Sequence, residues 1–234
     1  MIHARNLGVR FLFDRHGRLV TPTLVRLRRG GAGTWGIRDV TVTIERGEGV
    51  ALMGPTGSGK TTFLRTIAAV LPADAGVLDV RGRVGTLLAT DAGLMHMLTG
   101  RENALLLAVL AGLPRRDALR SLETVKMRSG LGEDFERPVA SFSQGMRARL
   151  GFAVADQVDA DILVLDEVHE ALDHEFRDVV EQRVRERLAA GGIVVAAGHD
   201  HSMLERLCGR ALLFADGRIE RDGQFEEVQR AYLS

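Results

Sequence analysis

One short segment constrains the fold of this chain more than any other. It is the run Gly54-Pro55-Thr56-Gly57-Ser58-Gly59-Lys60-Thr61, which is followed by Thr62. The run matches the pattern G-x-x-x-x-G-K-[ST] at every position and comes directly after a short apolar stretch, residues 50–53. Glycines let a backbone curl so that its N–H groups point at a bound polyphosphate, and a following helix adds its positive end. The apolar spacing of Phe63-Leu64-x-x-Ile67-Ala68 predicts that helix.

The motif assigns separate tasks to its residues. We expect Lys60 to reach the β- and γ-phosphates and the Thr61 hydroxyl to ligate Mg²⁺. The backbone of residues 54–59 and Thr62 are expected to complete the phosphate cradle.

Composition narrows the class of protein. The 234 residues are 45% hydrophobic and 26% charged, which is typical of a globular protein with a full core. The formal net charge is zero, so nucleic acid is not expected as a partner. Cys208 is the only cysteine, which excludes an internal disulfide and fits a reducing compartment. The longest apolar run, ten residues at 104–113, is too short to span a bilayer, and the N-terminus lacks a signal-peptide core. We therefore expect a cytoplasmic protein.

Alternating strand and helix patterns predict one α/β domain over residues 1–234, with a helical insertion at about residues 95–155. Strands are predicted at residues 2–13, 40–44, 50–53, 77–80, 84–88, 162–165 and 193–197, with a hairpin at Asp216-Gly217. Helices are predicted at 101–130 with a break at 112–114, after Ser143, near 174–190 and at 224–232. Residues 1–36 are interpreted as an N-terminal strand and a basic loop, which is either a solvated insertion or a patch against anionic lipid headgroups.

An acidic pair, Asp166-Glu167, follows the apolar run at residues 162–165. Such a run is typical of a strand covered by helices on both faces, and ligands of such sheets bind at the carboxyl edge. Asp166 is placed to hold Mg²⁺ through water, and Glu167 to polarise the water that attacks the γ-phosphate. The alternative interpretation is an acidic pair that caps the next helix.

A second motif brings in a protein family. The tetrapeptide Ser143-Gln144-Gly145-Met146, 23 residues before Asp166, resembles the signature motif of ATP-binding cassette (ABC) ATPases. The usual family sequence is Leu-Ser-Gly-Gly-Gln. Ser143 still offers a hydroxyl and Gly145 an unobstructed N–H where a helix begins. The resemblance extends from residue 37 onward and implies a P-loop NTPase fold of ABC type, with a mixed sheet core, antiparallel N-terminal strands, and bound ATP and Mg²⁺.

The same resemblance assigns further residues. Asp173 stands in the segment that contacts the opposite subunit, and His199 matches the switch histidine that contacts the γ-phosphate. An aromatic ring should stack on adenine. Phe11, Phe13 and Trp35 all lie near the expected place, and we favour Phe13 or Trp35.

One family residue is missing. Where the family has a glutamine after the strand at residues 84–88, this chain reads Leu88-Ala89-Thr90-Asp91. The role of that glutamine is left to Thr90 or Asp91, acting through water. We expect residues 88–98 to face a membrane subunit and Leu94, Met95 and Met97 to be exposed. The alternative is that these side chains pack the helical insertion against the sheet.

Segments such as Leu98-Thr99-Gly100-Arg101-Glu102-Asn103 are similar to ATPase subunits of bacterial polysaccharide exporters, which move O-antigen, capsule or teichoic acid chains. That similarity implies a homodimer with composite ATP sites, each using Lys60 of one subunit and Ser143 of the other. The dimer would bind an integral membrane permease at the inner face of the bacterial cell membrane. Two alternatives remain: an ABC ATPase unconnected with transport, and a regulatory subunit that binds ATP but hydrolyses it weakly.

Overall fold

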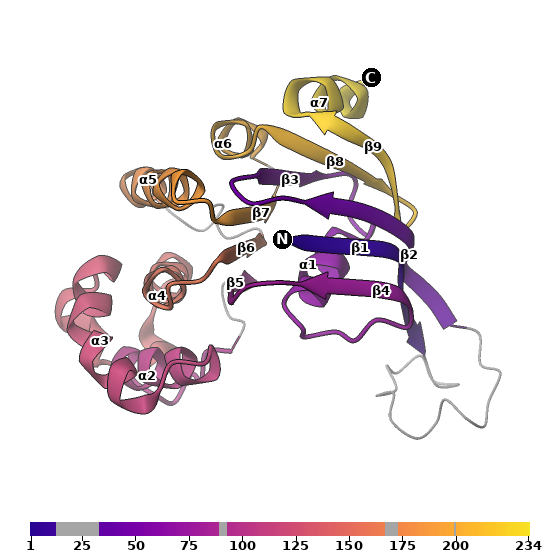
Figure 1. Ribbon diagram of the computed structural model, residues 1–234. Coiled ribbons are helices and arrows are strands. Elements are labelled where there is room, and N and C mark those ends of the chain that lie inside the picture. The colour runs from indigo at the N-terminus through magenta and orange to yellow at the C-terminus, as the bar shows by residue number, and fades with distance from the viewer. Residues whose placement is uncertain (13–32, 89–92, 167–172, 199) are drawn as a thin grey trace.

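The computed structural model of the chain describes residues 1–12, 33–88, 93–166, 173–198 and 200–234. The strands of this part form two sheets that lie beside each other (Figure 1). One sheet has the order β2-β1-β4 and the other the order β5-β6-β7-β3-β8-β9. The predicted α/β core with antiparallel N-terminal strands is therefore confirmed.

The smaller sheet is antiparallel and contains β1 (Ile2–Leu12), β2 (Gly33–Ile44) and β4 (Ala75–Val80). The predicted alternation in β2 is confirmed, because Val40, Val42 and Ile44 are buried while residue 41 is exposed. The prediction that residues 33–36 belong to a loop is wrong. They continue β2 because they pair with the end of β1, where Arg10 lies opposite Trp35. A partner strand 25 residues earlier supplies the ladder that the glycine-rich local sequence does not suggest.

The larger sheet carries the phosphate-loop strand near its centre. Its parallel strands are β5 (Val84–Leu88), β6 (Ile162–Asp166), β7 (Ile193–Ala197), β3 (Gly49–Met53) and β8 (Arg210–Ala215). The strand β9 (Arg218–Gln224) runs antiparallel to β8 through the predicted hairpin. Asp216 and Gly217 both have positive φ, at 46° and 76°, which is the geometry that suits a two-residue hairpin turn.

Helices cover both faces of the larger sheet, as the continuous apolar run in β6 predicts. These helices are α1 (Lys60–Ile67) on one face and, on the other, α4 (Gln144–Gln157), α5 (His174–Ala189), α6 (His201–Leu207) and α7 (Phe225–Leu233). In β6, Ile162 and Val164 share a buried cluster with Phe63 of α1, and Leu163 and Leu165 share another with α4 and α5. The small sheet packs on the other side of α1, so this helix lies between the two sheets (Figure 1). The short helix α6 has no counterpart among the predicted elements.

The chain between β5 and β6 is helical. It contains α2 (Gly100–Leu110), α3 (Arg115–Ser129), two 3₁₀ turns (Gly132–Glu136 and Val139–Ser141) and α4. The break between α2 and α3 falls at residues 111–114, as predicted. Thr99 and Glu102 cap α2 reciprocally, since each side chain accepts a hydrogen bond from the other residue's backbone N–H, at 3.2 and 2.9 Å. These helices enclose a core cluster of their own, which runs from Leu94 to Val154.

The packing of this region corrects one prediction. Leu94 is buried in the helical cluster and not exposed, because α2 and α4 close over it. Met95 and Met97 are exposed, as expected. No helix within the described ranges is long and apolar enough to cross a membrane.

Candidate functional site

The phosphate-loop motif lies between a fully buried strand and a helix, as predicted. β3 is buried at every position and α1 begins at Lys60. Gly54, Gly57 and Gly59 have φ values of 133°, 82° and 112°, which side chains disfavour. A side chain at Gly59 would also meet the carbonyl oxygen of Gly36, since a Cβ there would lie 2.7 Å away. The glycines are therefore required by the path of the loop.

Two neighbouring segments hold the loop in place. The backbone N–H of Gly217, in the β8–β9 turn, donates to the carbonyl of Ser58 at 3.0 Å. The N–H of Arg38 in β2 in turn donates to the carbonyl of Gly217 at 2.8 Å. Elements more than 150 residues apart in sequence thus fix one loop, which gives it a preformed shape.

Polar groups of the loop converge on its interior. The Lys60 ammonium group is buried and donates to the carbonyl oxygens of Gly54, at 2.7 Å, and Pro55, at 3.0 Å. The buried Ser58 hydroxyl has no hydrogen-bond partner among the described residues. A cationic group, an unsatisfied hydroxyl and a helix N-terminus together form a cradle suited to an anion.

A cavity of about 350 Å³ opens beside this loop. It is lined by Phe11, Thr34, Trp35, Gly36, Thr56, Gly57, Gly59, Lys60, Thr61 and Thr62. Thr61 and Thr62 therefore face the same space as the loop glycines. Two of the candidate aromatic residues, Phe11 and Trp35, also line it, whereas Phe13 lies outside the described residues.

The two aromatic side chains present different surfaces. Trp35 is 41% exposed, and the guanidinium carbon of Arg10 lies 5.9 Å from its ring centroid. Phe11 is partly buried and packs against the core cluster and Gly36. Trp35 therefore presents the more accessible ring to the cavity.

Asp166 lies at the carboxyl edge of the larger sheet, as predicted. It is buried at the end of β6 and stands opposite Ala197 of β7, which in turn stands opposite Leu52 of β3. The parallel strands thus bring Asp166 to the same edge as the loop that begins at Gly54. Glu167 and His199, the residues that follow this edge, lie outside the described residues.

The signature segment occupies a separate place. Ser143 is the exposed N-cap of α4, and its hydroxyl accepts a hydrogen bond from the Met146 N–H at 3.2 Å. Gly145 lies in the first turn of the same helix. Because α4 and α1 cover opposite faces of the larger sheet, Ser143 and Lys60 belong to different layers of the chain (Figure 1).

Asp173 has a role within the chain that the sequence did not suggest. It is the N-cap of α5 and accepts a hydrogen bond from the Phe176 N–H at 3.0 Å. Its other carboxylate oxygen forms an ion pair with Arg149 of α4. No set of three or more histidine, cysteine or acidic side chains in the described part is arranged to hold a metal ion.

Comparison with known proteins decides the family. The profile of the family described as ABC transporter matches residues 37–170. The O-antigen export system ATP-binding protein RfbB of Klebsiella pneumoniae is 36% identical, over 84% of this chain and 80% of its own length. This chain belongs to the ABC transporter family. It is accordingly an ATP-binding subunit of that family with the ATPase domain that the phosphate loop predicts.

Other relatives of this ABC ATPase agree. The O-antigen export system ATP-binding protein RfbE of Yersinia enterocolitica is 32% identical over 89% of this chain and 91% of its own. The teichoic acids export ATP-binding protein TagH of Listeria innocua is 32% identical, over 85% of this chain and 59% of its own. Among solved structures, the ATP-binding cassette MJ0796, described as dimeric and bound to ADP and Pi, superposes with a TM-score of 0.79 at 20% identity, over 96% of this chain and 99% of its own. That likeness confirms the fold.

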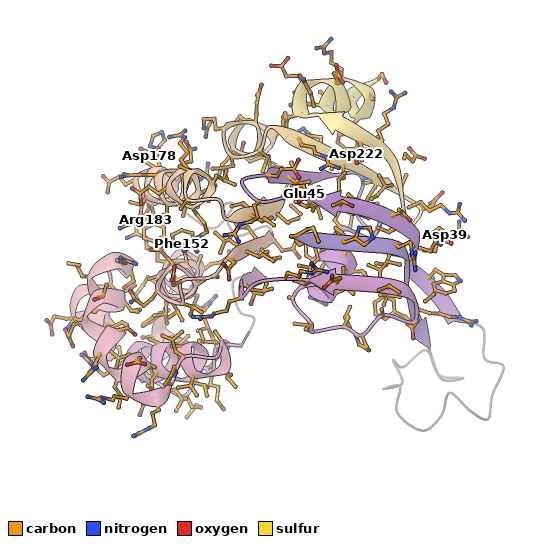
Figure 2. The ribbon with its side chains drawn as sticks, in the orientation of Figure 1. Asp39, Glu45, Phe152, Asp178, Arg183 and Asp222 are labelled. Atoms are coloured by element: carbon orange, nitrogen blue, oxygen red, sulfur yellow. The ribbon has the colours of Figure 1, made fainter. Side chains whose placement is uncertain are left out.

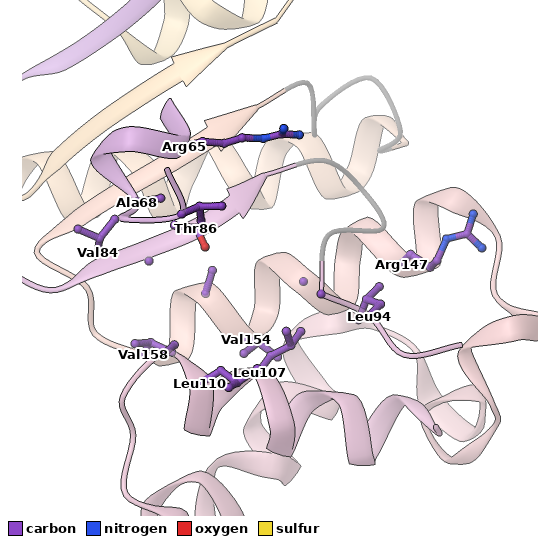
Figure 3. Close-up of a pocket in the computed structure, with 16 residues that line it drawn as sticks. Arg65, Ala68, Val84, Thr86, Leu94, Leu107, Leu110, Arg147, Val154 and Val158 are labelled. Carbon is purple, nitrogen blue, oxygen red and sulfur yellow. The ribbon is translucent and has the colours of Figure 1, made fainter. Parts of the chain in front are cut away.

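A second, larger cavity of about 570 Å³ lies away from the phosphate loop. Figure 3 shows Val84 and Thr86 on one side of it and Leu107 and Leu110 of α2 on the other. Its lining is mainly apolar and includes two arginines, Arg65 of α1 and Arg147 of α4. The cavity therefore lies between the sheet and the helical region.

Proposed function

We propose that this ABC ATPase hydrolyses ATP as a homodimer to drive export of a bacterial polysaccharide through a separate membrane permease. The observation that carries the proposal is the preformed phosphate cradle, in which buried Lys60 and the loop glycines share one sheet edge with Asp166. The substrate class is supported by the O-antigen and teichoic acid export proteins among the relatives.

The roles of the site residues are part of this proposal. Lys60 and the loop backbone bind the phosphates, Ser143 and Gly145 meet the γ-phosphate held by the opposite subunit, and Trp35 stacks on adenine. Thr61 and Asp166 would hold Mg²⁺, which neutralises charge on the phosphates when bound. Their oxygen donors suit that ion, since Mg²⁺ prefers hydroxyl, carboxylate and water ligands.

The remaining steps use residues next to the described edge. Glu167 accepts the proton of the attacking water, and His199 contacts the γ-phosphate. Asp173, beyond its capping role, lies close to the opposite subunit in the proposed dimer. Ser143 and Lys60 lie in different layers of one chain, which supports sites that are completed between two chains.

The larger cavity supports the permease contact. Its apolar walls and its two arginines suit a permease segment with apolar side chains and a carboxylate. Met95, 54% exposed, and Met97, 88% exposed, closely follow Leu94, which lines this cavity. The dimer would thus lie peripherally on the inner face of the cell membrane.

The test combines turnover with partner capture. Purified protein should hydrolyse ATP in the presence of Mg²⁺, and co-expressed permease should co-purify with it. Met97→Cys should crosslink to that permease, whereas Leu233→Cys, which is also well exposed but lies on α7, should not. The one native cysteine, Cys208, is buried and will not compete.

Three results would contradict the proposal. Binding of ATP without turnover would favour a regulatory subunit. Turnover without any permease contact would favour an ABC ATPase unconnected with transport. Normal surface polysaccharide in a strain that carries only Lys60→Ala protein would exclude export of that polymer.

A further inference from the structure

Two aspartates that cap helices in this structure also form ion pairs with a neighbouring helix. The first is Asp173, the N-cap of α5. Its Oδ1 accepts the Phe176 N–H at 3.0 Å, and its Oδ2 forms an ion pair with Arg149 of α4. The Arg149 guanidinium also lies 5.2 Å from the Phe176 ring centroid, and Phe152 of α4 meets the same ring edge-on at 5.9 Å. The signature helix α4 is thereby fixed to the first turn of α5.

The second aspartate is Asp200, the N-cap of α6. Its Oδ1 accepts the Met203 N–H at 3.2 Å and the Ser202 hydroxyl at 2.7 Å. Its Oδ2 lies 3.5 Å from Nη1 of Arg177, which belongs to α5. The start of α6 is therefore tied to α5 in the same way as α5 is tied to α4.

The two links meet on one rigid element. Asp173 and Arg177 are four residues apart at the start of α5, so they lie one above the other on the same face. A displacement of α4 that moves Arg149 acts on the first turn of α5, which carries Arg177 and so acts on Asp200. Both arginine side chains are partly buried, at 25% and 33% exposed, and their partners Asp173 and Asp200 are 53% and 27% exposed. Partial burial strengthens an ion pair relative to one in open solvent.

The two helices that α5 connects, α4 and α6, begin next to residues that serve different ATP sites. This assignment of the two helices to different sites rests on the proposed function. In a homodimer with composite sites, Ser143 at the start of α4 serves the site of the opposite chain, whereas His199, directly before Asp200, serves the chain's own site. We propose that Arg149 and Arg177 are positioning residues that couple the two ATP sites of the dimer through α5. Neither residue touches ATP in this scheme.

The experiment measures ATPase rate against ATP concentration for wild type, Arg149→Met and Arg177→Met. Two coupled sites give a Hill coefficient above 1 and at most about 2. Each variant should bring it to about 1, while the affinity of the single chain for ATP changes by less than about twofold. The matched control is Arg185→Met, also on α5, with a side chain 57% exposed and an ion pair to Glu181 of the same helix at 3.0 Å. It should keep the wild-type Hill coefficient.

Further variants separate coupling from folding. Asp200→Asn keeps the helix cap, because asparagine caps as well as aspartate, but loses the charge that faces Arg177. It should also lower the Hill coefficient, and the double variant should lower it by less than the sum of the two single effects, because both single variants remove the Arg177–Asp200 ion pair. Arg149→Lys keeps the charge and should retain part of the cooperativity.

Several outcomes of these experiments would contradict the inference. An unchanged Hill coefficient in Arg149→Met and Arg177→Met would overturn the inference, as would an equal loss in Arg185→Met. Wild-type turnover with a Hill coefficient of 1 would overturn this inference and leave the proposed ATPase intact. Wild type without turnover would overturn the proposed function, and this inference with it.

Discussion

The ammonium group of Lys60 lies 2.7 Å from the carbonyl oxygen of Gly54, the first residue of its own loop. This hydrogen bond folds the side chain across the loop and keeps the charge inside it, where Lys60 is only 8% exposed. A charge held in a partly dry cradle interacts with phosphate more strongly than one in open water.

Replacing this charge tests the cradle directly. Lys60→Ala should lower ATP affinity by at least tenfold and abolish turnover, because no other described lysine or arginine lines the cavity. Titration with a fluorescent ATP analogue measures the affinity. Lys126→Ala, which removes the only other lysine of the chain, provides the control and should bind ATP normally. Equal affinities for the two variants would remove Lys60 from the site.

The glycines of the loop should differ in their tolerance of a side chain. Gly59→Ala would bring a Cβ within 2.8 Å of the Ile37 side chain as well as close to the Gly36 carbonyl, at a φ of 112°. Gly57→Ala has the φ penalty alone, about 1 kcal/mol, since nothing lies within 4 Å of the new Cβ. Urea unfolding without nucleotide should therefore give Gly59→Ala a clearly lower free energy of unfolding than Gly57→Ala. The reverse ranking would contradict the described path of the loop.

The proposed division of each site between two chains can be tested by mixing variants. Ser143→Arg should block turnover while single chains still bind ATP, since Ser143 is exposed at the start of α4 and is not among the residues that line the cavity beside the phosphate loop. In a dimer of Ser143→Arg with Lys60→Ala, one composite site carries both lesions and the other carries neither. Partial recovery of ATPase activity on mixing is the expected result. Heterodimers that form without recovery would count against sites completed in trans.

A buried carboxylate ties the helical region to α5. Asp156 of α4, only 10% exposed, receives Arg128 of α3 at 2.8 Å and Arg183 and Arg187 of α5 at 3.6 Å. Figure 2 shows Arg183 extending from α5 toward α4. Asp156→Asn should lower the free energy of unfolding by about 3 kcal/mol, because three guanidinium groups lose their shared anion.

An exposed ion pair serves as the control for the loss of stability predicted in Asp156→Asn. Asp134 and Arg137 form an ion pair at 2.7 Å with both side chains well exposed. Asp134→Asn should therefore cost less than about 1 kcal/mol. Similar urea midpoints for Asp134→Asn and Asp156→Asn would show that the buried cluster contributes no more than the exposed pair.

The single cysteine predicts a loss of stability at high pH. Burial raises the pKa of the Cys208 thiol to about 12 in the folded chain, against about 8.5 in an unfolded one. Between these values the unfolded chain releases a proton that the folded chain keeps, so the free energy of unfolding falls by about 1.4 kcal/mol per pH unit. Urea unfolding at pH 8 and pH 10 should show this fall in wild type and a smaller one in Cys208→Ala. The same pH dependence in both proteins would contradict it.

The sequence predicts those parts of the site that are formed by a few consecutive residues. The phosphate loop needs glycines at fixed positions, and a buried strand such as β6 needs an uninterrupted apolar run, so both are visible in a few residues. Asp166 was placed correctly for the same reason, since it directly follows that run.

The features that local sequence does not predict depend on contacts between residues far apart in the chain. The pairing of Trp35 with Arg10 extends β2 into residues that look like a loop, and the closure of α2 and α4 buries Leu94. The ion pair of Arg149 with Asp173 joins residues 24 apart on different helices, and no local pattern signals it. The choice between Phe11 and Trp35 likewise depends on how two strands deliver their rings to one cavity.

The position of β3 in the larger sheet governs when the site can form. β3 ends at Met53, yet its neighbours on both sides are β7 and β8, which end at Ala197 and Ala215. During synthesis the phosphate loop leaves the ribosome long before the strands that flank it, and contacts so distant in sequence form late and slowly. A nascent chain therefore completes the sheet around its phosphate loop only after β8 has been made, and until then the apolar β3 segment lacks one or both of its neighbouring strands.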